Sequence, residues 1–221
     1  MTRRHVTSLI NFHALFIIPF GALLCLLAFC YGCQKAEEPK RDSTPSITTE
    51  NLQTAYGKSA RRVKMYSLFV DQAEKEHNKN MARLYRAISR SEAIHARNHA
   101  GLLKKQGIEA VAPADEPVVV GTIVQTLKMA LSSEEMEYDA MYPNLIRSAD
   151  AEKFTEASVQ FSRTRDADTR HGELVREATD KVGKIAPTDY FVCPECGYVI
   201  TSGKTEECPV CQTKKGLFEN I

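Results

Sequence analysis

Apolar and charged residues alternate with a helical period through the middle of the chain. From Asn51 to about Val182 the sequence is rich in Ala, Leu, Met, Glu, Lys and Arg, which are good helix formers. The pattern predicts four helices, at about 50–76, 79–105, 119–148 and 151–182. The segment GIEAVAPADEPV lies between the second and third helices and, fully extended, could cover about 40 Å. A four-helix bundle with one long crossover is therefore expected.

The predicted helices contain an internal repeat. Sliding the chain on itself by 76 residues pairs Tyr66 with Tyr142, Glu92 with Asp168, and His95 with His171. Apolar positions of two helices can align by chance. The second occurrence of an acid-x-x-His at the equivalent position is harder to explain in that way, and it indicates two copies of one helical hairpin.

The repeated motifs place metal-binding groups on one helical face. SEAIH and DTRH each hold a carboxylate and an imidazole three residues apart, so the two groups lie side by side. Bundles that bind two metal ions use a Glu-x-x-His on each of two helices and a glutamate on each of the others. In the third helix Glu134 and Glu137 are available, and oxygen and imidazole donors suit iron or manganese.

The cysteines form two separate groups, which argues against a secreted disulfide framework. The C-terminal group is CPECGYVITSGKTEECPVC, in which two Cys-x-x-Cys pairs are separated by eleven residues. Such pairs hold one iron or zinc ion tetrahedrally, so we expect a metal site at Cys193, Cys196, Cys208 and Cys211. A zinc ribbon would be structural, whereas an iron site could pass electrons to the bundle.

The N-terminus predicts export. Residues 1–33 begin MTRRH and continue into a long apolar run, typical of a signal or membrane segment. CYGCQK resembles the lipobox of bacterial lipoproteins, which would make Cys33 the lipidated residue. An uncleaved anchor helix and ordinary cleavage are the alternatives. Residues 34–48 read as a flexible tether, and the net charge of +1 gives no reason to propose a nucleic-acid partner.

Together these motifs resemble the rubrerythrin family over about residues 50–221. The marks are NLQTAY, SEAIHARNH, E-x-x-E-x-x-x-MYP, D-x-x-H and the four-cysteine segment. The resemblance implies an all-α four-helix ferritin-like bundle at 49–184, followed by a small rubredoxin-like metal-binding domain at 189–221. It further implies that Glu92 and Asp168 bridge two irons, that His95 and His171 are terminal ligands, and that Glu134 and Glu137 complete the set.

The first helix departs from the family pattern at YGKSA. The repeat places the missing glutamate at Lys58 and alignment to the family places it at Ser59, a difference that a bulge in the third helix would explain. Neither residue is a carboxylate. If Lys58 points inward, its ammonium could stand in for one metal ion. We therefore expect the ion at Glu134 and His171 to be bound more firmly than the ion near His95 and Glu137.

Two tyrosines are candidates for orienting the ligands. Tyr66 and Tyr142 are spaced so that their hydroxyls could reach ligand carboxylates, although both could be core aromatics instead. His99 lies one turn beyond His95, and we expect it not to be a ligand.

The N-terminus predicts an exported, membrane-anchored protein, and the family resemblance implies that it is an oxidoreductase. Its reaction would be reduction of hydrogen peroxide to water at the carboxylate-bound iron, a peroxidase reaction, with electrons delivered by the Fe(Cys)4 centre. A homodimer is expected, because in this family the rubredoxin iron of one subunit serves the partner's bundle. The electron donor is unknown. The alternative is a membrane-tethered electron carrier or metal-binding protein whose bundle site is mono-metal or empty.

Overall fold

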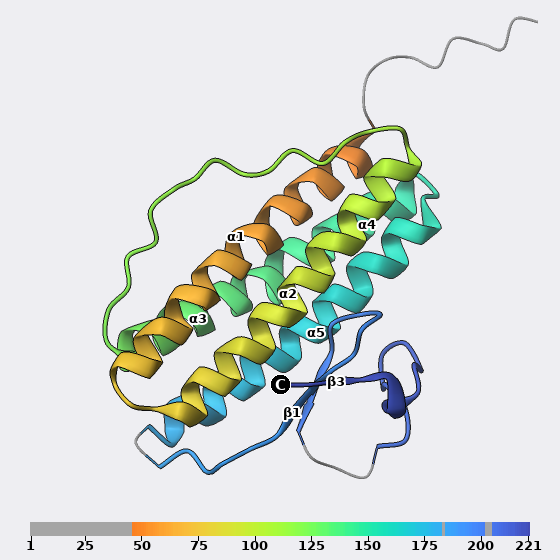
Figure 1. Cartoon of the computed structure of the whole chain (residues 1–221). Coiled ribbons are helices and arrows are strands. Elements are labelled where there is room, and N and C mark those ends of the chain that lie inside the picture. The colour runs from red at the N-terminus through yellow and green to blue at the C-terminus, as the bar shows by residue number, and fades with distance from the viewer. Residues whose placement is uncertain (1–45, 183, 202–204) are drawn as a thin grey trace, which may run out of the picture. The chain divides into compact units, whose positions relative to one another are not determined.

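The computed structural model describes residues 46–182, 184–201 and 205–221. The predicted export segment at 1–33, its Cys33 and nearly all of the predicted tether lie outside these residues. The helical part, shown in Figure 1, consists of α1 (Ile47–Lys75), α2 (Lys79–Lys105), α3 (Ile123–Glu135), α4 (Tyr142–Ala151) and α5 (Thr155–Asp180). No helix in the described ranges combines the length and the apolar character needed to cross a bilayer.

Side-chain caps explain where three of the helices begin. Ser46 accepts a hydrogen bond from the backbone of Thr49 at the start of α1, and Asn78 does the same for α2. Thr122 forms a reciprocal capping box with Gln125, so α3 begins at residue 123 rather than at the expected 119. Each such cap typically stabilises a helix by about 1 kcal/mol.

The predicted third helix is continuous but contains a π-helical segment, η1 (Met136–Met141), between α3 and α4. A π-helical segment adds a residue to the helix without changing the direction of the chain. This extra residue confirms the expected bulge. It explains why the repeat offset that pairs the two tyrosines misses the family's ligand position by one residue.

The long connection between α2 and α3 follows the outside of α1, as Figure 1 shows. Gln53 of α1 exchanges two hydrogen bonds with the backbone of Val111. Further along the same helix, Lys64 forms an ion pair with Asp115. The predicted crossover along the length of the bundle is therefore confirmed.

Helix α1 contributes one continuous buried face to the bundle. Its spacing alternates between three and four residues, as expected for a helix with one face in a core. The buried residues of this face are Leu52, Ala55, Ser59, Arg62, Tyr66, Phe69 and Ala73. The middle of this buried face is polar, because Ser59 and Arg62 lie there, and it is directed toward the interior of the bundle.

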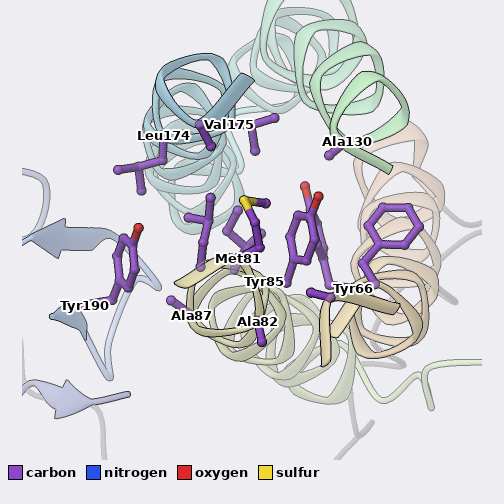
Figure 2. Packing of buried hydrophobic residues seen from close by; sticks show 14 of the residues in the cluster. Tyr66, Met81, Ala82, Tyr85, Ala87, Ala130, Leu174, Val175 and Tyr190 are labelled. Atoms are coloured by element: carbon purple, nitrogen blue, oxygen red, sulfur yellow. The ribbon is translucent and has the colours of Figure 1, made fainter. Parts of the chain in front are cut away.

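The C-terminal part, residues 190–221, is called the cysteine module below. Its strands β1 (Tyr190–Val192), β2 (Val199–Thr201) and β3 (Glu219–Asn220) form an antiparallel sheet in the order β2-β1-β3. A short 3-10 helix, η2 (Lys215–Leu217), precedes β3. Tyr190, Val192 and Val199 belong to the same buried cluster as the helical core, and Figure 2 shows Tyr190 extending from its strand toward the helices.

Candidate metal centres

Three helices bring together a buried group of three carboxylates and one histidine. Glu92 comes from α2, Glu134 from α3, and Asp168 and His171 from α5. One ligand atom from each lies within 4.8 Å of the others, and all four side chains are fully buried. We call these four residues the bundle site. Its histidine directs Nδ1 inward, 3.6 Å from both Glu134 Oε2 and Asp168 Oδ1.

The bundle site has the chemistry expected of a metal centre. Within the described part of the chain, Glu92 Oε2, Glu134 Oε2, both oxygens of Asp168 and Nδ1 of His171 are buried without a hydrogen-bond partner. Buried polar atoms are normally satisfied, because leaving them unpaired costs free energy. A cation among these atoms would satisfy them together, and the donor set suits iron or manganese. The residues therefore fit one metal ion.

The structure also places a buried arginine beside the bundle site, and the sequence analysis missed it. Arg62 Nη1 lies 2.6 Å from Glu134 Oε1 and 3.1 Å from Glu92 Oε1. Its Nε donates to Glu137 Oε1 at 3.0 Å, and its Nη2 donates to Ser133 Oγ at 3.0 Å. Every nitrogen of this guanidinium thus has a partner.

The expectation that Lys58 provides the inward cation is wrong. Lys58 is only partly buried, and its ammonium has no carboxylate within ion-pair distance in the described ranges. Ser59, by contrast, is fully buried. Positions 59, 62 and 66 share the inner face of α1 because they follow the three-four spacing of a helix. Residue 58 is turned about 100° away from residue 59.

Burial and charge shift the acidity of these carboxylates in opposite directions. Burial opposes ionisation of Glu92, but the positive charge of Arg62, aided by His95 and His171, lowers its pKa to about 2. Burial raises the pKa of Glu137 to about 7, although Arg62 opposes this shift. Burial and the charges of Glu92 and Glu134 raise the pKa of Asp168 well above its usual value. Arg62 therefore favours the ionised form of Glu92, whereas burial favours the protonated forms of Glu137 and Asp168.

His95 connects the bundle site to the cysteine module. Its Nδ1 lies 3.4 Å from both Glu92 Oε2 and Asp168 Oδ1, and its Nε2 lies 3.1 Å from the backbone oxygen of Cys196. A carbonyl oxygen only accepts hydrogen bonds, so Nε2 must carry the proton. In the neutral ring the lone pair of Nδ1 then points toward the carboxylates, as in a metal-binding histidine.

The tyrosines differ in their partners. Tyr66 donates from its hydroxyl to Glu134 Oε1 at 2.5 Å, which confirms that it reaches a candidate ligand. The hydroxyl of Tyr142 instead lies 3.4 Å from His99 Nε2, so the expected contact with a carboxylate is wrong for this residue.

Asp168 is one methylene shorter than glutamate, and neither of its oxygens has a hydrogen-bond partner in the described part of the chain. Burial lowers the pKa of His99 to about 3.

The four cysteines of the module form a second compact group. Cys193 Sγ lies 3.5 Å from Cys211 Sγ, and Cys196 Sγ lies 3.5 Å from Cys208 Sγ. All four sulfurs lie within 4.8 Å of one another, and none is in a disulfide. Four sulfurs at these distances fit one tetrahedral iron or zinc ion.

Polar contacts hold the module against one side of α2. Ser91 Oγ donates to the backbone oxygen of Gly197 at 2.5 Å, and Asn98 Nδ2 donates to that of Glu195 at 2.7 Å. Arg90 binds the carboxylate of Glu219 with two nitrogens. The same helix that carries Glu92 and His95 therefore also positions the cysteines.

Known proteins share both parts of this architecture. Residues 50–179 match the family profile described as Rubrerythrin. Rubrerythrin-2 of Clostridium acetobutylicum is 29% identical over 182 residues, covering 79% of this chain and 96% of that protein. Nigerythrin of Nitratidesulfovibrio vulgaris is 28% identical over 175 residues, covering 77% and 85%.

Solved structures agree with the sequence matches. A structure described as the fully reduced, all-ferrous state of nigerythrin superposes with a TM-score of 0.74 at 27% identity, covering 82% of this chain and 89% of that one. The fold, the four-cysteine group and the carboxylate–histidine group thus point the same way, and the chain belongs to the rubrerythrin family of non-haem iron proteins.

Proposed function

We propose that this protein reduces hydrogen peroxide to water, using iron in the bundle and electrons delivered through an iron held by the cysteine module. The observation that carries the proposal is the position of His95. Its ring contacts the carboxylates of the bundle site on one side and the backbone of Cys196 on the other. One side chain thus bridges the two candidate centres within a single chain.

Each residue of the site has a definable role in this reaction. Glu92, Glu134, Asp168 and His171 would hold iron, which supplies one-electron redox chemistry when bound. Tyr66 fixes the orientation of Glu134 by its hydrogen bond. The surrounding apolar core excludes bulk water, which strengthens the interactions among these charges.

The reaction sets a clear electron requirement. Conversion of one H2O2 to two H2O breaks the O–O bond and consumes two electrons and two protons. The reductant would be a one-electron donor that acts on the cysteine module. Its identity is open, and dithionite can replace it in a test.

The test is peroxide consumption, in the absence of oxygen, by the iron-loaded chain after reduction with dithionite and removal of the excess reagent, which itself consumes peroxide. We expect peroxide to disappear while the visible absorption of the oxidised Fe(Cys)4 centre returns. Cys208→Ser is the matched control, because it removes one sulfur from the module without altering the bundle. Peroxide consumption at the rate of free iron would contradict the proposal. Such a result would favour the alternative that the protein is an electron carrier. Arg62 gives a reason to test that alternative, because its positive charge lies against two carboxylates of the bundle site.

The cellular setting remains part of the proposal. We infer an exported protein attached to the membrane through lipid at Cys33 or through its apolar N-terminal segment. We also propose a homodimer, on the family resemblance alone, because the contact of His95 with Cys196 already joins the two centres within one chain. Sedimentation of the full chain in detergent would test it. A monomer at working concentration would contradict that part alone.

A further inference from the structure

We propose that the guanidinium of Arg62 occupies the place of a second metal ion, so that the bundle binds a single ion at Glu92, Glu134, Asp168 and His171. The inference concerns the same site as the proposed function. It does not depend on peroxide being the substrate.

The carboxylates of Glu92 and Glu134 each turn one oxygen toward Arg62 and leave the other without a hydrogen-bond partner among the described residues. In each residue Oε1 faces Arg62, at 3.1 Å and 2.6 Å respectively. The Oε2 of each is buried and has no hydrogen-bond partner among the described residues. One oxygen of each carboxylate is therefore committed to the guanidinium, and the other remains available to an ion beside His171.

Every nitrogen of the Arg62 guanidinium is fixed by a buried or partly buried partner. Its Nε binds Glu137, its Nη1 binds Glu92 and Glu134, and its Nη2 binds Ser133. The side chain is 3% exposed. Breaking a buried ion pair by removing one partner is strongly destabilising, because it leaves an unpaired buried charge. A second metal ion would have to displace this side chain from three carboxylates.

The first helix also lacks the glutamate that the family pattern uses to hold a second ion, and Ser59 stands at the aligned position. Ser59 lies buried one turn before Arg62 on the inner face of α1 and offers a neutral hydroxyl. A second ion would thus lose one anionic ligand and compete with a fixed positive charge for Glu137. The missing carboxylate at position 59 and the added cation at position 62 both weaken the binding of a second ion.

The charge of the site supports a single ion. The four carboxylates of Glu92, Glu134, Glu137 and Asp168 carry −4 when ionised, and Arg62 brings the sum to −3. One divalent ion gives −1, whereas two give +1. An unpaired buried charge is unfavourable. A proton on one carboxyl removes the −1 that one ion leaves, whereas a proton only adds to the +1 that two ions leave.

The test is the number of irons per chain. The full chain in detergent is titrated with ferrous iron without oxygen, and total iron is compared with the iron in the cysteine module, measured by its own absorption. We expect one iron beyond the module's iron and no magnetic coupling between bundle ions by EPR or Mössbauer spectroscopy. A coupled pair of bundle irons in the natural sequence would overturn the inference, and so would a bundle without iron.

Variants of neighbouring arginines on α1 sharpen the test. Ser59→Glu combined with Arg62→Ala should raise the bundle stoichiometry from one to two and create the coupled pair. Arg61→Ala is the matched control, because Arg61 is partly exposed and pairs with Glu116 on the surface. It should leave one bundle iron. If the double variant fails to fold, the iron count of the natural sequence still decides.

The two proposals can fail independently. One bundle iron without peroxide turnover would uphold the inference about Arg62 and contradict the proposed function. A coupled di-iron site that reduces peroxide would do the reverse.

Discussion

Replacing Gly197 with alanine would disturb the contact between the cysteine module and His95. An added Cβ at this position would lie 2.6 Å from His95 Nε2 and 2.7 Å from Ser91 Oγ. Both distances are shorter than real contacts of a Cβ atom. The glycine also has a φ of +81°, in the left-handed region where other residues are strained.

These two effects act on different equilibria. The left-handed conformation costs alanine about 1–2 kcal/mol whether or not the module touches the bundle, so it lowers the stability of the module alone. The steric contacts with His95 and Ser91 exist only when the module lies against α2. Such overpacking typically costs about 1–3 kcal/mol. That cost lowers the ratio of docked to undocked module by about 5- to 150-fold.

The assay is reoxidation of the reduced Fe(Cys)4 centre after rapid mixing of the iron-loaded chain with peroxide. If electrons pass only while the module is docked, the rate in Gly197→Ala should fall with the docked fraction, by at most the factor by which the docking ratio falls. Gly107→Ala carries a similar backbone strain, at φ +77°, with no atom within 4 Å of the added Cβ. Gly216→Ala lies in the module and meets no atom either. Both controls should keep the natural rate.

An unchanged rate in Gly197→Ala, with the Fe(Cys)4 absorption intact and hydrogen exchange along α2 showing that the module is largely undocked, would refute this reasoning. It would mean that the contact between His95 and Cys196 does not lie on the path of the electrons.

Three other changes have defined outcomes. Tyr66→Phe should weaken iron binding in the bundle by about 10–100-fold through loss of the bond to Glu134, as measured by chelator competition; Tyr85→Phe, whose hydroxyl pairs with Thr126, should not. Burial lowers the pKa of His99 from 6.5 to about 3, so as the pH falls below 6.5 the unfolded chain binds a proton that the folded chain does not, and the folded state loses stability. Relative to His99→Gln, the natural chain should lose about 3 kcal/mol of unfolding free energy between pH 7.5 and 4.5. Parallel pH profiles of the two proteins would contradict this. Cys33→Ser should abolish incorporation of labelled lipid in cells, whereas Cys30→Ser should retain it; labelling of Cys33→Ser would exclude the lipobox assignment.

The sequence predicted those parts of the molecule that depend on local spacing. The helical period, the length of the crossover and the paired Cys-x-x-Cys motifs each determine a structure within a short segment. The one-residue mismatch in the repeat even predicted the π-helical segment in the third helix. These features follow from backbone geometry and need no knowledge of packing.

The sequence analysis missed Arg62 because it searched only the aligned ligand position. The buried stripe of α1 has spacing that includes residues 59, 62 and 66, so a buried arginine was visible in the periodic pattern itself. The partner of Tyr142 and the contact of His95 with Cys196 could not be found in this way. They depend on how helices and module pack together, which local spacing does not determine.

The guanidinium of Arg62 has a consequence for how the protein matures. In a site that binds two metal ions, the buried carboxylates repel one another until both ions have bound. Here one cation is part of the polypeptide, and it pairs with Glu92, Glu134 and Glu137 as soon as α1, α2 and the third helix meet. The bundle can therefore fold before it encounters any iron. Loading then becomes a single non-cooperative step.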